Sequence, residues 1–301
     1  MSERHAHDRE AGHAGQTAVG RAALLTGTFM VVEVIGGLYA GSLALLADAG
    51  HMLTDTGALA FAWLAFVMAR RRADGRRSFG YARFEVLAGM INALLLVGLV
   101  AVIAVEAAQR LAAPVPVRAG PMLLVAIAGL VVNVVAFRLL HAGADHVNVR
   151  GALLHVLGDL LGSVAAIVGA VVIMATGWLP VDPLLSLLVA ALVLVSALRL
   201  LRETGHILLQ GTPREIDTDR VKAELRGAVP GVRDVHHLHV WSLTSGRHVT
   251  TLHLRIDDDA SPTGVVAGAK ARLSEAFGLD HSTIQVCGEI CPDDAADGGA
   301  G

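Results

Sequence analysis

Two pairs of metal-binding residue types lie within long apolar stretches of this chain. His51 and Asp55 are four residues apart, and His155 and Asp159 repeat that spacing. Four residues of helix advance about 6 Å and return to the same face, so each pair can act together. Two imidazole nitrogens and two carboxylate oxygens form a tetrahedral set that suits Zn²⁺. We therefore predict one metal site shared by two helices, with a purely structural hydrogen-bond network as the alternative.

Three further polar residues lie in the same apolar environment. Asp48 precedes His51 by three residues and shares its helix face, Glu33 belongs to the first apolar stretch, and Asn92 belongs to the third. Ionisable groups at membrane depth are costly and usually mark a site or a pathway. These residues could orient the metal ligands, line a water-filled path, or only bond neighbouring helices.

The composition indicates a membrane protein. Of 301 residues, 54% are hydrophobic and 17% are charged, against about 25% charged in soluble domains. Six apolar runs approach the roughly 20 residues that cross a bilayer. We expect a six-helix transmembrane domain over residues 21–203, between a disordered tail at 1–20 and the rest of the chain. The runs cover residues 22–40, 43–69, 84–108, 121–141, 152–176 and 179–201.

Arginine distribution predicts the orientation. The loop after the second run holds six arginines, whereas the opposite side of the membrane holds only Arg110 and Arg118. Because positive loops stay in the cytoplasm, both termini are expected there. The net charge of −3 gives no indication of nucleic-acid binding.

Residues 206–292 change character and predict a small soluble domain. Helical periodicity covers 217–229 and 263–277, and alternating patterns mark strands at 235–243, 249–256 and 283–289. The order α-β-β-α-β fits an α+β fold of ferredoxin-like type. Strand alternation places His237 and His239 on one face and His236 on the other. Residues 293–301 predict a disordered tail, and two cysteines near the end do not suggest a disulfide framework.

Five stretches of the chain together resemble the cation diffusion facilitator family of zinc transporters, in particular its bacterial cobalt, zinc and cadmium efflux members. They are residues 41–55, 77–85, 148–159, 235–242 and 282–286. The resemblance implies a multi-pass protein of the bacterial inner membrane that forms a homodimer and exchanges metal for protons. It also implies that His51, Asp55, His155 and Asp159 form the transport site, with His51 giving the zinc-preferring pattern.

The resemblance also implies a regulatory metal in the cytoplasmic domain, where His236 and His253 match known ligand positions. Some relatives carry a further His on the third strand, where this chain has Gln285. Cys287 and Cys291 could substitute, although their spacing is not the Cys-x-x-Cys zinc signature and Cys287 could be a small core residue. Our candidate ligands there are His236, His239, His253 and Cys287. The loop after the second run has one carboxylate, Asp74, and no His, so we expect no metal in that loop.

These observations favour a Zn²⁺ efflux carrier, a secondary active transporter rather than an enzyme. Protons compete with metal for the same His and Asp atoms, so alternating exposure of one site would exchange the two. Cobalt, nickel, iron or cadmium could be the cargo instead, and a metal-gated sensor or channel is a second alternative. A metallohydrolase is disfavoured because the stretch from His51 to Asp55 lacks the Glu of a His-Glu-x-x-His motif.

Overall fold

The computed structural model describes residues 24–54, 74–141, 147–244, 246–288 and 291; for 139–141 and 147–158 it describes the backbone only. The chain divides into two compact units. A membrane unit comprises residues 1–61 and 91–201, and a C-terminal unit comprises 62–90 and 202–301. Each unit is described by itself below.

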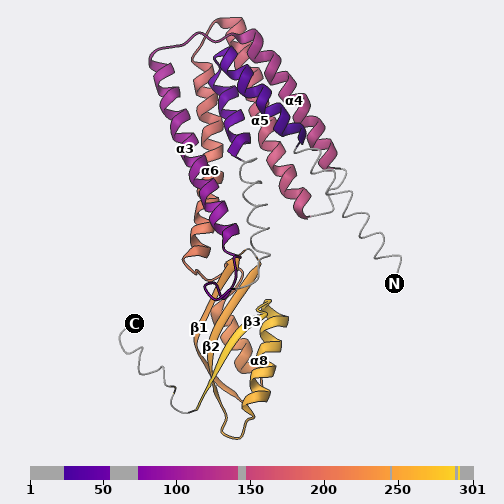
Figure 1. Ribbon diagram of the computed structural model, residues 1–301, viewed down its shortest axis with the longest axis vertical. Helices are drawn as coiled ribbons and strands as arrows, with labels where there is room; N and C mark the ends of the chain where they lie inside the picture. Colours follow the sequence, from indigo (N-terminus) through magenta and orange to yellow (C-terminus); the bar gives the residue numbers. More distant parts are fainter. Residues whose placement is uncertain (1–23, 55–73, 142–146, 245, 289–290, 292–301) are drawn as a thin grey trace, which may run out of the picture. The chain divides into compact units, whose positions relative to one another are not determined.

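Apolar helices build the membrane unit (Figure 1). Four of those in the described ranges are long and apolar enough to cross a membrane, which makes this a multi-pass membrane protein. They are α3 (Phe84–Ala112), α4 (Ala119–His141), α5 (Val147–Thr176) and α6 (Val181–Leu208). Two shorter apolar helices precede them, Leu24–Ala40 and Leu43–Thr54. The predicted second span continues to residue 69, and residues 55–69 lie outside the described residues.

Several helices extend beyond the apolar runs that predict them. α3 ends at Ala112 rather than 108, α5 begins at Val147 rather than 152, and α6 continues to Leu208 rather than 201. Hydropathy marks where the lipid-facing surface ends, whereas a helix continues until its backbone hydrogen bonding stops. The last turns of α6 are therefore helical although they carry Arg202, Glu203 and His206.

Helix Leu43–Thr54 packs between two groups of helices. On one side, Ala44 and Leu45 share a buried cluster with α4 and α5 residues such as Ala126 and Ala166. On the other side, Leu43 and Ala47 share a cluster with α3 and α6; its members from those helices are Leu96, Val100, Ile103, Ala107, Ala190, Val193 and Ala197. The many alanines allow helix backbones to approach closely, which is how helices associate in lipid. This helix, which carries His51, is thus held on both sides.

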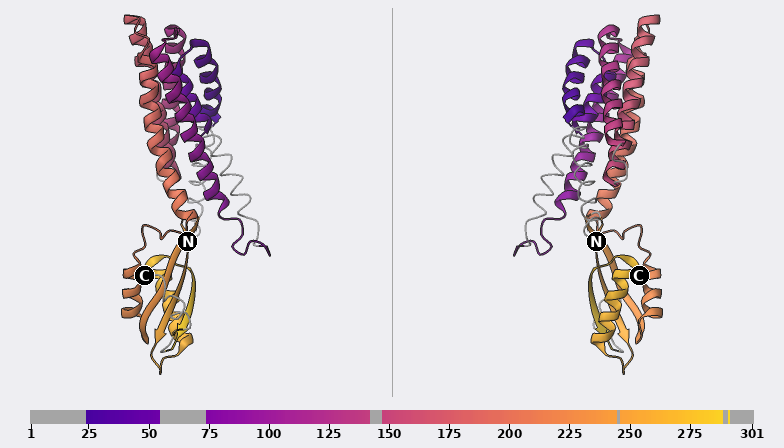
Figure 2. Two further views of the ribbon diagram at one scale, coloured as in Figure 1. Left: turned by 90° about the vertical axis from the view of Figure 1, so that its left-hand side faces the viewer. Right: turned by 90° about the vertical axis from the view of Figure 1, so that its right-hand side faces the viewer.

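The C-terminal unit contains a three-stranded sheet and two helices, in the order predicted from the sequence. The elements are α7 (Thr218–Ala228), β1 (Val232–Thr244), β2 (Arg247–Ile256), α8 (Pro262–Phe277) and β3 (His281–Cys287). The sheet order is β1-β2-β3, with β1 and β2 antiparallel and β2 and β3 parallel. The sheet and its helices can be followed in the two views of Figure 2.

One face of this sheet is covered by both helices. Leu252 and Leu254 of β2 pack in a buried cluster with Leu225 of α7 and Leu273 of α8. Because side chains alternate along a strand, His253 belongs to the opposite face. Helix ends are fixed locally: Ser261 caps α8 through the Gly264 N–H, and Gly278 ends α8 with the positive φ of 64° that glycine adopts without cost.

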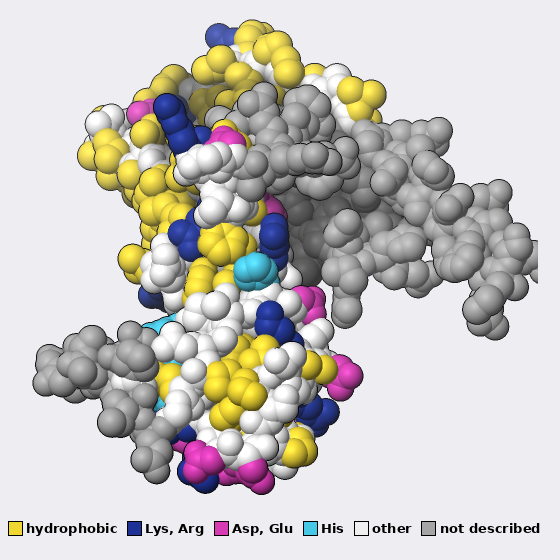
Figure 3. Space-filling model, turned by 60° about the horizontal axis from the view of Figure 1, so that its bottom comes forward, with side chains coloured by type: hydrophobic (Ala, Val, Ile, Leu, Met, Phe, Trp, Pro, Cys, Tyr) yellow, Lys and Arg dark blue, Asp and Glu magenta, His cyan; other side chains and the backbone are white. Residues whose placement is uncertain are grey.

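The surface differs between the two units. On the face shown in Figure 3, hydrophobic side chains gather over the described membrane helices, whereas the C-terminal unit carries a mixture of acidic and basic side chains. Large apolar side chains such as Leu24, Leu38 and Leu124 are more than 60% exposed. Such exposure is costly in water and normal in contact with lipid tails.

Candidate metal centres

The first candidate centre lies where helix Leu43–Thr54 crosses α5. An ideal Cβ atom on Gly162 would lie 2.6 Å from Asp48 Oδ1, so the Asp48 carboxylate packs directly on the α5 backbone. A larger residue at 162 would displace it. Gly162 therefore makes room for a buried carboxylate at this crossing.

The two helices run antiparallel at this crossing. Ala44 and Leu45 pack with Ala166, Ala170 and Ile173, so residue numbers fall along α5 as they rise along the partner helix. His51 lies about one turn beyond Asp48, and Asp159 lies about one turn before Gly162. The crossing therefore places His51 and Asp159 at the same level, as a shared metal site requires.

Buried carboxyl groups from three helices gather at this level. Glu33, Asp48 and Asp159 are 1%, 4% and 1% exposed. The carboxyl groups of Glu33, Asp48 and Asp159 lie close enough to interact electrostatically with one another. The cluster thus combines acidic oxygens with a half-buried His51, and both kinds of group can bind either a metal ion or a proton.

Two of the four predicted transport ligands cannot be placed. Asp55 lies outside the described residues, and for His155 the structure describes the helical backbone of α5 but not the side chain. Asn92 is buried in α3, at 6% exposed, and its suggested supporting role stays a prediction.

The second candidate centre lies in the C-terminal unit. His236, His253, Cys287 and Cys291 each offer one ligand atom, and these four atoms lie within 4.8 Å of one another. His236 is paired with His253 across β1 and β2, and His253 is paired with Gln285 of β3. Two residues beyond Gln285, Cys287 returns to the face of His253. Two His nitrogens and two Cys sulfurs form a donor set that fits structural zinc.

A bulge in β1 alters the histidines expected from simple alternation. The pairing of β1 with β2 is irregular between His236 and His239, and His237 has a φ of +47°. The His237 ring centroid consequently lies 4.9 Å from that of His253 and 5.4 Å from that of His236. The alternation prediction, which separates His237 from His236, is therefore wrong here, because an inserted residue breaks the period of two.

His239 does not join the cluster. It is exposed and lines a separate hollow of about 320 Å³ with residues that include Leu238 and Trp241. Cys291 takes part in the cluster in its place. The structure thus brings together three of the four residues first proposed for this centre.

The two cysteines are joined by a disulfide, although a disulfide framework was not expected from the sequence. Gln285 Nε2 lies 3.9 Å from both sulfurs, and Cys291 Sγ lies 3.3 Å from His253 Nδ1. Only thiolates bind metal, so the disulfide and a metal ion are alternative states of the same two sulfurs.

Asp74, the one carboxylate of the arginine-rich loop, accepts hydrogen bonds from the backbone of its own loop. Its Oδ1 accepts hydrogen bonds from the N–H groups of Arg76 and Arg77 at 2.9 and 2.8 Å, and its Oδ2 accepts one from the Tyr81 hydroxyl. The bond from the Arg76 N–H, followed by that from Tyr81, lowers the pKa of Asp74. The carboxylate therefore stabilises a turn.

Two family descriptions match consecutive parts of this chain. The family description "Cation efflux transmembrane domain" matches residues 20–209, and "Cation efflux protein, cytoplasmic domain" matches residues 213–289. The chain belongs to the cation efflux family, the cation diffusion facilitators. The family boundary between residues 209 and 213 lies just after the end of α6.

Named relatives of this cation efflux protein match it over most of its length. The zinc transporter ZitB of Pectobacterium atrosepticum is 46% identical, over 98% of this chain and 91% of its own. The metal cation efflux system protein CzcD of Cupriavidus metallidurans is 42% identical, over 99% and 93%. A cadmium, cobalt and zinc/H⁺-K⁺ antiporter of Bacillus subtilis is 40% identical, over 87% and 86%.

Proposed function

We propose that this protein expels divalent cations from the cell, with Zn²⁺ as its main cargo and protons as the counter-ion. The observation that supports this proposal most directly is the close approach of Asp48 to Gly162, from which we infer that His51 and Asp159 lie at one level among buried carboxyl groups. The names of the relatives support the cargo and the exchange, since they include zinc transporters and a proton-coupled antiporter.

His51, Asp55, His155 and Asp159 form the proposed transport site. Binding requires neutral His and ionised Asp, so metal and protons compete for the same atoms. Expelling a divalent ion against an inside-negative potential costs about 4.6 kcal/mol per 100 mV, at roughly 2.3 kcal/mol per unit charge. Inward proton flow can offset this cost.

The architecture proposed for this function has six membrane helices per subunit, both termini in the cytoplasm, and a homodimer in the bacterial inner membrane. The arginine-rich loop supports the orientation. The order α7-β1-β2-α8-β3 supports a ferredoxin-like fold for the cytoplasmic domain. A carrier of this kind forms no covalent intermediate, and we assign no catalytic residue.

A transport assay tests the proposal. Purified protein in liposomes that contain a zinc-sensitive dye should import Zn²⁺ when the lumen is more acidic than the outside. Asp55→Ala and Asp159→Asn should abolish the flux, because each removes an ionised ligand. A wild-type protein that shows no proton-driven flux, or variants with unchanged flux, would refute the carrier. A metal-gated channel would instead conduct without the proton gradient.

We infer a second, regulatory metal site at His236, His253, Cys287 and Cys291. The proximity of the four donors supports it. After reduction with a phosphine, the full-length protein should bind one Co²⁺ per chain there with a thiolate charge-transfer band. His253→Ala should remove the band, and His239→Ala, which changes an exposed His outside the cluster, should leave it. A band that is unchanged in His253→Ala would contradict this site.

A further inference from the structure

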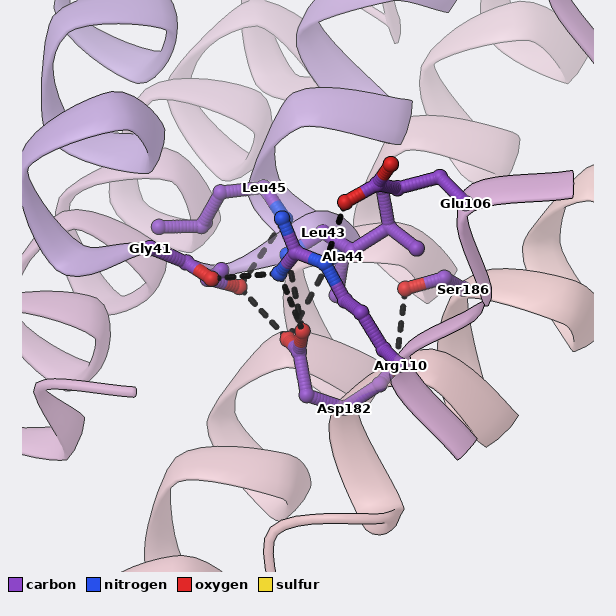
Figure 4. Close-up of polar contacts among 9 residues, drawn as sticks. Gly41, Leu43, Ala44, Leu45, Glu106, Arg110, Asp182 and Ser186 are labelled. Atoms are coloured by element: carbon purple, nitrogen blue, oxygen red, sulfur yellow. Dashed lines mark hydrogen bonds and ion pairs between the residues drawn. The ribbon is translucent and has the colours of Figure 1, made fainter. Parts of the chain in front are cut away.

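A buried carboxylate that belongs to neither centre connects several membrane helices at their ends. Asp182 lies in the first turn of α6 and is fully buried, at 0% exposed. Its carboxylate does not point into α6 but toward the start of helix Leu43–Thr54 (Figure 4). Burial of a carboxylate in a membrane protein is costly, so its partners must offset that cost.

Those partners are the first hydrogen-bond donors of helix Leu43–Thr54. Asp182 Oδ2 accepts from the Leu43 N–H at 2.7 Å, and Oδ1 accepts from the Ala44 N–H at 3.3 Å. Ser42 donates its hydroxyl to Asp182 Oδ1 at 2.6 Å and accepts from the Leu45 N–H at 3.3 Å. The opening N–H groups of a helix have no partner within the helix. Ser42 and Asp182 together satisfy three of them.

The same carboxylate is linked to the ends of two further helices. Arg110, in the last turn of α3, lies with Nη1 3.8 Å from Asp182 Oδ2. That nitrogen also donates to the Gly41 carbonyl at 2.6 Å, where helix Leu24–Ala40 ends, and Arg110 Nε bonds Glu106. Asp182 therefore joins the ends of four helices at one point, as Figure 4 shows.

We propose that Asp182 is a positioning residue for metal transport, which sets where helix Leu43–Thr54 begins and so where His51 lies against α5. This inference rests on the proposed function, because it treats His51 as a transport ligand. Leu43 and His51 are eight residues apart on one continuous helix, about 12 Å along its axis. A shift or tilt at the capped end is carried along that rigid rod to the ligand.

The position of helix Leu43–Thr54 depends on Asp182 because, in the part of the chain that the structure describes, no other hydrogen-bond acceptors replace its carboxylate at the buried start of the helix. At an exposed helix end, water replaces a lost cap, and the cost is about 1 kcal/mol. Here the capped N–H groups donate to a carboxylate that is buried. The surroundings are apolar, since Leu43 and Ala47 pack against α3 and α6. Without Asp182, the helix must move or unwind to find new partners for its first turn.

Cobalt binding to the full-length protein tests this role. The background variant carries His253→Ala and Cys287→Ser, so that bound Co²⁺ reports the membrane site alone, and His51→Ala in that background gives the spectrum without the site. Asp182→Ala should weaken Co²⁺ binding by between about tenfold and a hundredfold and diminish the tetrahedral absorption bands. In transport, it should raise the KM for Zn²⁺ more than it lowers the maximal rate.

Two variants distinguish positioning from a general loss of structure. Asp182→Asn keeps an oxygen that can accept the Leu43 N–H, so it should recover part of the affinity lost in Asp182→Ala. Glu106→Gln alters the other carboxylate on Arg110, which bonds none of the N–H groups at the start of helix Leu43–Thr54, and should bind Co²⁺ like the background.

The outcomes separate the two proposals. If Asp182→Asn and any folded Asp182→Ala protein bind Co²⁺ like the background, the positioning role is wrong while the membrane site stands. If Glu106→Gln weakens Co²⁺ binding as strongly as Asp182→Ala, the loss of affinity comes from a disturbed Arg110 rather than from the lost hydrogen bonds between Asp182 and the start of helix Leu43–Thr54. The proposal is then also overturned. If the background shows no His51-dependent spectrum, the proposed transport site itself fails and the positioning role fails with it.

Discussion

At the scale of single residues, the chemistry of position 51 is expected to decide which metal is carried. A neutral imidazole at 51 suits a tetrahedral Zn²⁺ site and leaves two carboxylates in the proposed ligand set. Asp at 51 would add a negative charge and a carboxylate that can bind through two oxygens, which suits the larger Cd²⁺. The ligand at 51 thus sets the charge and the field of the site.

The variant His51→Asp should therefore raise Cd²⁺ transport relative to Zn²⁺. The ratio of the two initial rates, measured side by side in liposomes at equal metal concentrations, checks this expectation. Gly98→Ala, at a position in α3 where an added Cβ meets nothing within 4 Å, serves as a control for nonspecific loss of selectivity. If the ratio does not rise in His51→Asp, position 51 is not the selectivity element.

Residue types and their spacing identify metal ligands more readily than they identify the residues that hold the ligand-bearing helices in place. The spacing of His51 with Asp55, and of His155 with Asp159, is readable because both members lie on one helix. Asp182 was missed, since its partners are 138 to 140 residues away and only the fold brings them together. A local signal did exist, because Ser42 directly before an apolar run is typical of a helix N-cap.

At the scale of secondary-structure elements, the sequence pattern predicts the three strands but not the bulge in β1 between His236 and His239. The pairing of His236 with His253 follows from two alternating strands joined by a short turn. The bulge at His237 requires one extra residue in β1, and the hydrophobic pattern carries no sign of it. The His237 ring and the Cys291 sulfur therefore lie beside His253 in a way that strand periodicity does not show, whereas His239 is outside the four-residue cluster.

The crossing of helix Leu43–Thr54 with α5 gives an element-scale prediction. In Gly162→Ala the new methyl group would meet all three outer atoms of the Asp48 carboxyl group, at 2.6, 3.0 and 3.2 Å. Overpacking of this kind typically costs about 1–3 kcal/mol. The variant should unfold at a lower temperature in detergent and transport Zn²⁺ more slowly, because the two ligand-bearing helices are pushed apart.

Gly98→Ala is the matched control for this change. An ideal Cβ atom at Gly98 meets nothing within 4 Å, and α3 gains a better helix former. Its melting temperature should equal or exceed that of the unaltered protein. Equal behaviour of the two alanine variants would show that the crossing tolerates a methyl group, and the close approach at Gly162 would lose its significance.

At the scale of the whole molecule, charge placement and helix direction together predict one orientation in the membrane. The loop before α3 carries Arg76, Arg77 and Arg83, and the helix that follows ends near Arg110 at the opposite side of the membrane unit. Only the first of these two sides has an excess of arginine. Arg110 belongs to the Asp182 network, so in the proposed orientation this network would lie at the outer face of the carrier.

Reporter fusions to the full-length and truncated chain test this orientation. A green fluorescent protein joined after residue 301 should fluoresce, and an alkaline phosphatase joined there should be inactive, because that end is predicted to be cytoplasmic. A phosphatase joined after residue 115, between α3 and α4, should be active, since Ala113–Val117 follow the end of α3 at the outer face. The reverse pattern would place the regulatory centre outside the cell, where Cys287 and Cys291 would remain oxidised and a redox-dependent metal site could not operate.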